Sequence, residues 1–294
     1  MNEFDRFAKY EKFTKENPFD LAKHSSIGVG GYAEIAFYPR DESELIGLIA
    51  QLKADKIKFY VVGNMTNVLP ADGLINKAIV CIKKICGVEI GEKTYVAAGT
   101  SSNQLLRHCK SAKKSGAEFL SGVPCTLGGA LYMNAGAAGT YIDEIVEEVR
   151  VLRDGKIQTL ALKDCAYSYK HSVFMQNDDI ILGATLRLKD SDEKTIEETE
   201  KRYLQRRAHL PKGRSMGCVF KNPKHGASAG ELIEKAGLKG LRVGGAVVAM
   251  QHANFILNDR GATQQDIRTL ISIIKSAVSA QYKIELEEEI RYLI

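Results

Sequence analysis

Two glycine-rich turns constrain the fold of this chain more than any other feature of its sequence. The first, residues 63–67, follows the apolar run 59–62, which predicts a short buried strand. The second, residues 122–130, is followed by another small-residue segment at 134–139. Such a backbone can approach another group closely and offer a row of N–H donors to a diphosphate. Turns that only let two elements pack tightly are the alternative interpretation.

Neither turn carries a common nucleotide-binding signature. The Walker spacing of glycines before a lysine is missing, and no G-x-G-x-x-G segment opens a helix. The usual mononucleotide and Rossmann dinucleotide signatures are therefore excluded.

Length and composition indicate a soluble chain of several lobes. With 294 residues it is about twice as long as a common single domain, so two or three lobes are expected. Hydrophobic residues make up 45% and charged residues 26%, which excludes global disorder, collagen and coiled coil. The net charge of +5 is too small and too dispersed to indicate a nucleic-acid partner.

Membrane, export and metal-binding classes are not supported by the sequence. The longest apolar stretch is far shorter than the ~20 residues of a spanning helix, and the charged start lacks the apolar core of a signal peptide. Six cysteines without a C-x-x-C pair, and histidines without i,i+4 pairs, predict reduced thiols and no metal site. We therefore expect a cytoplasmic protein that contacts no membrane.

The hydrophobic pattern predicts a mixed α+β chain that begins with a polar helix or loose arm. Thr263 and Asp266 form a capping pair for the last long helix, and Asp154-Gly155 predicts a hairpin turn between 149–153 and 156–160. Apolar spacing predicts other helices at 41–52 and 102–116, and opposite charges at i,i+4 predict a highly charged helix at 192–207. Strands are predicted at 33–38, 59–62, 78–82, 94–98, 180–188 and 284–292.

A thiol, a cation and a carboxylate are candidates for catalysis. Cys218, Lys170 and Glu289 could form a proton donor beside a pair that stabilises an anion. Taken singly, a small buried thiol, a surface cation and a strand residue are the plainer interpretations. The basic run from Arg202 to Arg214 could meet a nucleotide diphosphate or form the solvated end of a helix.

Segments spread in order over residues 25–291 resemble the UDP-N-acetylenolpyruvoylglucosamine reductase family, in its shorter subclass, which lacks an extra loop. The two glycine turns, within 61–69 and 122–130, are similar to the family's G-G-S-N and I-P-G-T-V-G-G loops. Residues 25–31, 134–139, 169–174, 217–223 and 286–291 are similar to T-x-G-x-G-G, N-x-G-A-x-G, Y-R-x-S-x-F, G-S-x-F-K-N-P and L-E-x-E-V-R. A chance match of this ordered set is improbable.

The resemblance implies an α+β, FAD-binding fold of the PCMH/vanillyl-alcohol-oxidase type. The expected division is an N-terminal arm (1–20), two α+β FAD-binding subdomains (21–88 and 89–208) and a C-terminal α+β substrate domain (209–294). The implied FAD-binding residues are Gly63, Asn64, Met65, Thr66, Asn67, Gly122, Val123, Pro124, Thr126, Leu127, Gly128, Asn134, Gly136 and Gly139.

The resemblance also implies a reaction and its residues. A monomeric oxidoreductase would use NADPH to reduce FAD, and then reduce the enolpyruvyl group of a UDP-sugar in peptidoglycan precursor synthesis. Cys218 falls where the family has a proton-donating serine, and Lys170 and Glu289 fall where it has an enolate-stabilising arginine and glutamate. The implied substrate contacts are Asn222, Lys221, His252 and His209.

The departures from the family pattern keep two other functions open. A thiol donates a proton more readily than an alcohol, but lysine lacks the planar donor fork of arginine. The residues 64–66 also crowd the first turn relative to the family's small residues. The first alternative is a paralogue that acts on another substrate. The second is a non-catalytic protein that binds flavin or a nucleotide-sugar.

Overall fold

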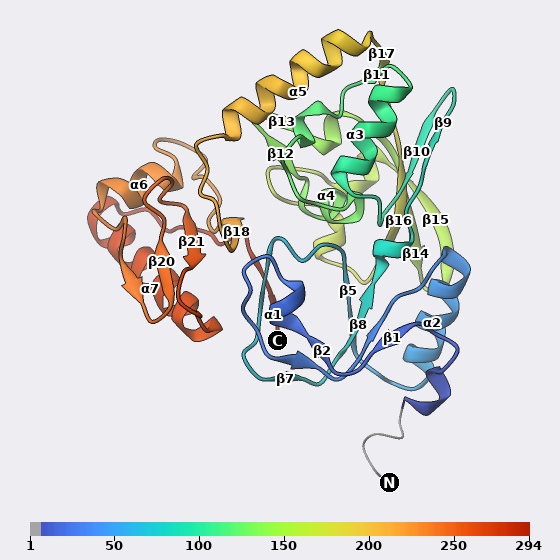
Figure 1. Ribbon diagram of the computed structural model, residues 1–294, viewed down its shortest axis with the longest axis horizontal. Helices are drawn as coiled ribbons and strands as arrows, with labels where there is room; N and C mark the ends of the chain where they lie inside the picture. Colours follow the sequence, from blue (N-terminus) through green and yellow to red (C-terminus); the bar gives the residue numbers. More distant parts are fainter. Residues whose placement is uncertain (1–6) are drawn as a thin grey trace. The chain divides into compact units, whose positions relative to one another are not determined.

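The computed structural model describes residues 7–294, which form two compact units interleaved along the chain (Figure 1). The first unit consists of residues up to 17, 35–64 and 77–207, and the second of residues 18–34, 65–76 and 208–294. Each unit buries an apolar cluster of its own. The predicted four-part division stays a prediction, and residues 1–6 of its N-terminal arm lie outside the described residues.

The first unit holds the longer strands of the chain. Its helices are α2 (Glu42–Ala54), α3 (Ser102–Ser111), α4 (Leu127–Met133) and α5 (Glu193–Arg207). Its strands are β1 (Lys15–Glu16), β4 (Ala36–Phe37), β5 (Phe59–Val62), β8 (Ala78–Cys81), β9 (Val88–Ile90), β10 (Thr94–Ala97), β11 (Lys114–Ser115), β12 (Gly136–Ala137), β13 (Thr140–Tyr141), β14 (Val146–Arg153), β15 (Lys156–Ala161), β16 (Ile180–Leu186) and β17 (Lys189–Asp190).

Two sheets organise this unit, with strand orders β1-β4-β8-β5 and β15-β14-β16-β10-β9. Strand β16 is buried along almost its whole length, which agrees with its mostly apolar sequence. The predicted hairpin is confirmed as β14–β15. Its turn residues Asp154 and Gly155 both have positive φ, at 49° and 74°, as a two-residue type I′ turn requires.

Aromatic side chains anchor the described part of the predicted N-terminal arm. The rings of Phe7, Tyr10 and Phe13 lie with their centroids 6.2, 5.2 and 6.2 Å from that of Phe37 in β4. All three residues are almost fully buried. Their spacing of three residues puts them on one side of the chain, so residues 7–13 belong to the core of the first unit.

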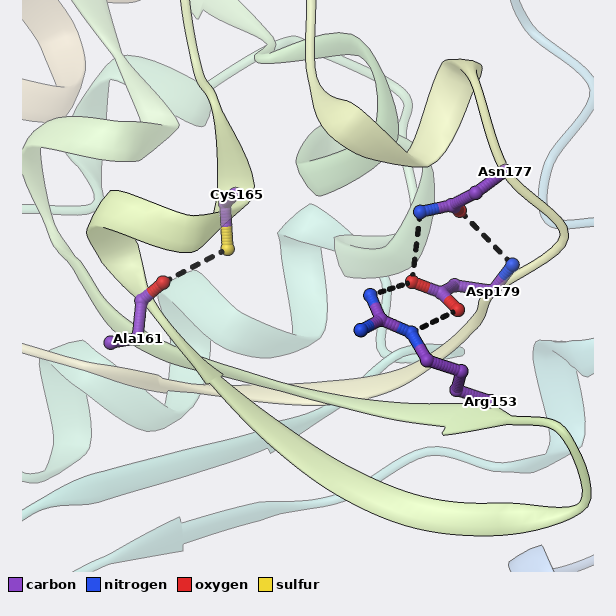
Figure 2. A network of polar contacts seen from close by, with 5 residues as sticks. All are labelled: Arg153, Ala161, Cys165, Asn177 and Asp179. Carbon is purple, nitrogen blue, oxygen red and sulfur yellow. Dashed lines mark hydrogen bonds and ion pairs between the residues drawn. The ribbon is translucent and has the colours of Figure 1, made fainter.

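Figure 2 shows a polar network at the end of the β14–β15 hairpin. Arg153 donates through Nε and Nη2 to the two oxygens of Asp179, at 2.8 and 2.6 Å. Asn177 Nδ2 donates to the same carboxylate at 3.0 Å, and in the same view the Cys165 thiol donates to the carbonyl of Ala161. Because the Asp179 side chain is only 4% exposed, these donors replace its lost hydration.

We expect Arg153→Ala to lower the free energy of unfolding by about 1–3 kcal/mol, because the Asp179 carboxylate would lose a two-point partner while staying buried. Because the guanidinium is partly exposed, this loss of stability should be smaller than for a fully buried ion pair. Urea unfolding of the purified wild-type and variant proteins measures the change in the free energy of unfolding. Arg40→Ala, which removes an exposed ion pair with Glu44, is the matched control and should change little. Equal effects of the two substitutions would contradict the prediction.

The second unit is assembled from three separate stretches of sequence. Its helices are α1 (Leu21–His24), α6 (Ala229–Lys235) and α7 (Gln264–Tyr282). Its strands are β2 (Phe19–Asp20), β3 (Tyr32–Ala33), β6 (Val68–Pro70), β7 (Leu74–Ile75), β18 (Ser215–Cys218), β19 (Arg242–Val243), β20 (Ala246–Val248), β21 (Phe255–Asn258) and β22 (Arg291–Leu293). The main sheet has the order β18-β21-β20-β19, and β22 pairs in parallel with β6.

Helix α7 is fixed at its start by residues from two of these stretches. The predicted capping pair is confirmed, since Thr263 and Asp266 bind each other's backbone N–H groups. Asp72, from the stretch 65–76, also accepts a bond from Gln264 N at 2.6 Å. No helix of residues 7–294, α7 included, is long and apolar enough to cross a membrane.

Three predicted elements differ from the structure. The strand expected at 33–38 is split into β3 and β4, because the chain passes from the second unit to the first at residue 35. The helix expected to end at Gly116 ends at Ser111, where Ala112 caps it, and β11 follows. The terminal strand expected at 284–292 is reduced to β22, since Glu288 instead forms an isolated bridge with Phe220.

Candidate functional site

The two glycine turns contact each other inside the first unit. A Cβ atom on Gly63 would lie 2.2 Å from Thr126 Oγ1, so only glycine allows this approach. Asn64 Nδ2 also donates to the carbonyl of Pro124 at 3.2 Å. Residues 63–64 of the first turn and 124–126 of the second therefore lie in direct contact in the first unit.

The second turn leads into helix α4, which the sequence analysis did not predict. Thr126 caps the helix, because its Oγ1 accepts a bond from Gly129 N at 3.3 Å. The amides of Leu127 and Gly128 donate to the carbonyls of Thr100 and Ala98, both at 2.8 Å. These two predicted cofactor residues thus use their N–H groups to hold α4 in the protein.

The start of the second turn lies against helix α5. Gly122 has a φ of +74°, and a Cβ there would approach Leu204 and Arg207 to 3.2 and 3.3 Å. The carbonyl of Val123 accepts a bond from the Ser102 hydroxyl at the beginning of α3. Helices α3 and α5 therefore fix the shape of this turn.

The second half of the first turn, residues 65–67, belongs to the second unit. Met65 has a positive φ of 51° and accepts a bond from Ser26 N, and the half-buried Thr66 follows it. Asn67 Nδ2 donates to the carbonyl of Glu289 at 3.1 Å. The Asn67 side chain thus holds the terminal segment that carries the predicted catalytic carboxylate.

Two of the three predicted catalytic residues lie on neighbouring segments of the second unit. Cys218 is the last residue of β18 and is partly exposed. In the segment that follows it, the carbonyl of Val219 accepts a bond from Glu289 N, and Lys221 N donates to the carbonyl of Glu287, both at 2.8 Å. The structure therefore brings the chain around Cys218 and Glu289 together, although they are 71 positions apart (289 − 218).

The predicted substrate residue His252 is stacked near His209 in the second unit. Their ring centroids are 6.4 Å apart with an interplanar angle of 20°. Burial, and then the nearby His209, lower the pKa of His252. Its Nδ1 accepts a bond from Asn254 N at 3.3 Å, so the ring is oriented by the backbone of its own loop.

Two further predicted substrate residues are engaged within the second unit. Asn222 Oδ1 accepts a bond from Ala229 N at the first turn of α6, at 3.0 Å. Lys221 forms an ion pair with Glu287 at 2.5 Å. Both side chains thereby tie the segment after Cys218 to its neighbours.

The third predicted catalytic residue, Lys170, belongs to the first unit. It lies in a turn, 168–171, whose end residues Ser168 and His171 exchange both backbone hydrogen bonds at 3.1 Å. The predicted cofactor residue Asn134 contacts this turn, whereas Gly136 and Gly139 lie in and after β12. That Lys170 acts together with Cys218 and Glu289 stays a prediction.

Comparison with known proteins decides the family. A model described as "UDP-N-acetylenolpyruvoylglucosamine reductase, C-terminal domain" matches residues 208–293, and one described as "FAD binding domain" matches residues 33–161. The UDP-N-acetylenolpyruvoylglucosamine reductase of Geotalea uraniireducens (strain Rf4) is 36% identical over 275 residues, which cover 92% of this chain and 91% of that protein. The chain belongs to the UDP-N-acetylenolpyruvoylglucosamine reductase family.

Other members of the reductase family agree with this assignment. The enzyme of that name from Thermotoga maritima is 37% identical over 276 residues, covering 92% of this chain and 95% of that one. The crystal structure of the reductase from Thermus caldophilus matches with a TM-score of 0.82 and 30% identity, over 96% of this chain and all of that one. The predicted α+β, FAD-binding fold is confirmed.

One residue that shapes the candidate site was missed in the sequence. Asn254 is buried and binds both the N–H and the carbonyl of Phe220, at 2.9 and 2.8 Å. It therefore fixes the segment after Cys218 to the loop of His252. Nothing in the spacing of residues around Asn254 shows which partner its amide binds.

No group of three or more His, Cys, Asp or Glu side chains in residues 7–294 is arranged to hold a metal ion. All six cysteines are free thiols.

Proposed function

We propose that the protein is an NADPH-dependent flavoenzyme that reduces UDP-N-acetylenolpyruvoylglucosamine to UDP-N-acetylmuramate in peptidoglycan precursor synthesis. Membership of the reductase family supports this proposal. The observation that carries it is the pairing of the segment after Cys218 with the terminal segment, in which Glu289 N bonds to the carbonyl of Val219.

The joined glycine turns are the proposed FAD site. Gly63 leaves no room for a side chain beside Thr126, and Gly122 and Gly129 in the second turn are exposed. A side-chain-poor backbone of this kind fits a diphosphate, and the matched FAD-binding region, 33–161, spans both turns. When bound, FAD supplies the hydride transfer from NADPH to the substrate.

Cys218 is the proposed proton donor. Saturating a carbon–carbon double bond requires a hydride on one carbon and a proton on the other. The Cys218 thiol gives its proton to the carbon that carries the carboxylate, and solvent then reprotonates the thiolate. A free thiol has a pKa of about 8.5, so at neutral pH it is protonated yet gives up its proton more readily than an alcohol.

Lys170 and Glu289 are the proposed stabilisers of the negative charge that develops on the substrate's carboxylate. Glu289 has a fixed backbone, since its N–H bonds to Val219 and its carbonyl to Asn67. The proposed contacts of the UDP-sugar are Asn222, Lys221, His252 and His209.

Anaerobic stopped-flow absorbance of the flavin tests the proposed function. NADPH should bleach the oxidised flavin, and UDP-N-acetylenolpyruvoylglucosamine should restore its absorbance. Bleaching without recovery would favour a paralogue that acts on another substrate. A flavin that NADPH does not reduce would favour a protein that only binds its ligand.

We expect Lys170→Arg to support recovery of the flavin absorbance as fast as the wild type or faster. Arginine keeps the charge and adds a planar donor fork that matches a carboxylate. The rate constant of recovery in stopped flow is the measurement, and Lys163→Arg, at an exposed position of the same unit, is the matched control. A large loss in Lys170→Arg alone would mean that the site depends on the compact ammonium group.

A further inference from the structure

The turn that carries Lys170 has a conformation that needs support from outside. Lys170 has a φ of +54°, in the left-handed region that residues with a side chain adopt at a cost of about 1 kcal/mol. It is the third residue of a tight turn, a position that often takes glycine or asparagine when its φ is positive. The two hydrogen bonds between Ser168 and His171 close the turn, but they do not fix it to the rest of the unit.

The support comes from the end of α4 and from the hairpin after it. Asn134 Nδ2 donates to the carbonyl of Ser168 at 2.9 Å. The Ser172 hydroxyl donates to the carbonyl of Tyr132 in α4 at 2.6 Å. The ring of Tyr169 meets that of Tyr141 edge-on, with centroids 6.1 Å apart. Every one of these contacts lies within the first unit.

Asn134 is suited to this position by both its backbone and its amide. It ends α4 with a φ of 44°, a conformation that asparagine tolerates better than most residues. The residue is 2% exposed, and its amide uses both ends, because Oδ1 accepts a bond from Asp143 N at 3.3 Å while Nδ2 donates to the carbonyl of Ser168. An aspartate would lose the donor and turn a carboxylate oxygen toward the Ser168 carbonyl.

We propose that Asn134 is a positioning residue for Lys170. It connects the turn of the proposed cation to α4, the helix that begins within the second glycine turn of the proposed FAD site. One short helix thus links the cofactor turn at its start with the Lys170 turn at its end. The inference rests on the proposed function for the role of Lys170, and on the contacts above for the role of Asn134.

Hydrogen–deuterium exchange of the holoenzyme tests the contact itself, independently of activity. Asn134→Gly keeps the left-handed backbone without strain and removes both amide bonds. The amides of Ser168 and His171 should then exchange about tenfold faster or more, as expected when a bond of about 1.4 kcal/mol is lost. Asn177→Gly, which removes another amide of the same unit, should leave them unchanged. Unchanged exchange at the turn in Asn134→Gly would overturn the proposal.

A double-mutant cycle tests whether Asn134 acts through Lys170. We expect Asn134→Gly to slow the recovery of flavin absorbance by substrate about 10- to 100-fold, and Lys170→Met about 10²- to 10³-fold. The double variant should be no slower than Lys170→Met. If the double variant were slowed by the product of the two single-variant factors, the proposal would be overturned. If the wild type shows no recovery with substrate, the proposed function fails while the exchange result still decides whether Asn134 holds the turn.

Discussion

Replacing Cys218 with alanine is expected to slow the recovery of flavin absorbance by substrate about 10²- to 10⁴-fold, the usual contribution of a positioned general acid. Bleaching by NADPH should be unchanged, because no proton from this thiol is needed when the flavin is reduced. The measurement is anaerobic stopped flow with the two reactants added in sequence. The partly exposed position of Cys218 at the end of β18 leaves the thiol accessible to a substrate.

Two controls make the Cys218 prediction specific. Cys86→Ala removes an exposed thiol of the first unit and should alter neither step. Cys218→Ser restores a proton donor of the family's type and should recover most of the rate. Recovery of flavin absorbance at the wild-type rate in Cys218→Ala would remove Cys218 from the role of proton donor.

Replacing Gly63 with alanine is expected to release most of the bound FAD and to lower the free energy of unfolding by about 1–3 kcal/mol. The new methyl group would lie 2.2 Å from Thr126 Oγ1 and would push that hydroxyl away from Gly129 N. Loss of this helix cap adds about 1 kcal/mol. The ratio of flavin to protein absorbance after gel filtration and the urea unfolding midpoint are the measurements.

Gly47→Ala is the matched control for the Gly63 substitution. Gly47 lies on the exposed side of α2, where a Cβ would meet nothing within 4 Å. In a helix this change should raise stability by up to about 1 kcal/mol and leave the FAD content unchanged. A Gly63→Ala protein that keeps its FAD and its stability would contradict the steric role of the contact between the turns.

The sequence predicts the parts of this protein whose causes are local. Apolar spacing predicts α2, opposite charges at i,i+4 predict α5, and a capping pair predicts the start of α7. The Asp154-Gly155 pair predicts the β14–β15 turn, and each of these signals depends on neighbours a few residues away. Helix α4 was missed because its glycines favour a turn, and what holds it is remote: the carbonyls of Ala98 and Thr100.

The candidate site shows the same division between local and distant causes. The glycine turns and Cys218 are visible as motifs, whereas the partner of each asparagine is not. Asn67 binds Glu289, which is 222 positions away, and Asn134 binds Ser168, which is 34 positions away. An amide side chain can donate and accept almost anywhere, so its type does not reveal its partner.

The interleaving of the two units sets an order of events during synthesis. Ile27, Val29 and Leu69 leave the ribosome early, yet they are buried in the cluster completed by residues from Met216 to Ile290. Strand β6 likewise cannot pair with β22 until the chain has been synthesised as far as residue 293. The nascent chain therefore carries unprotected apolar segments until residues 216–290 have been synthesised, and binding of a chaperone to these early segments would shield them in the meantime.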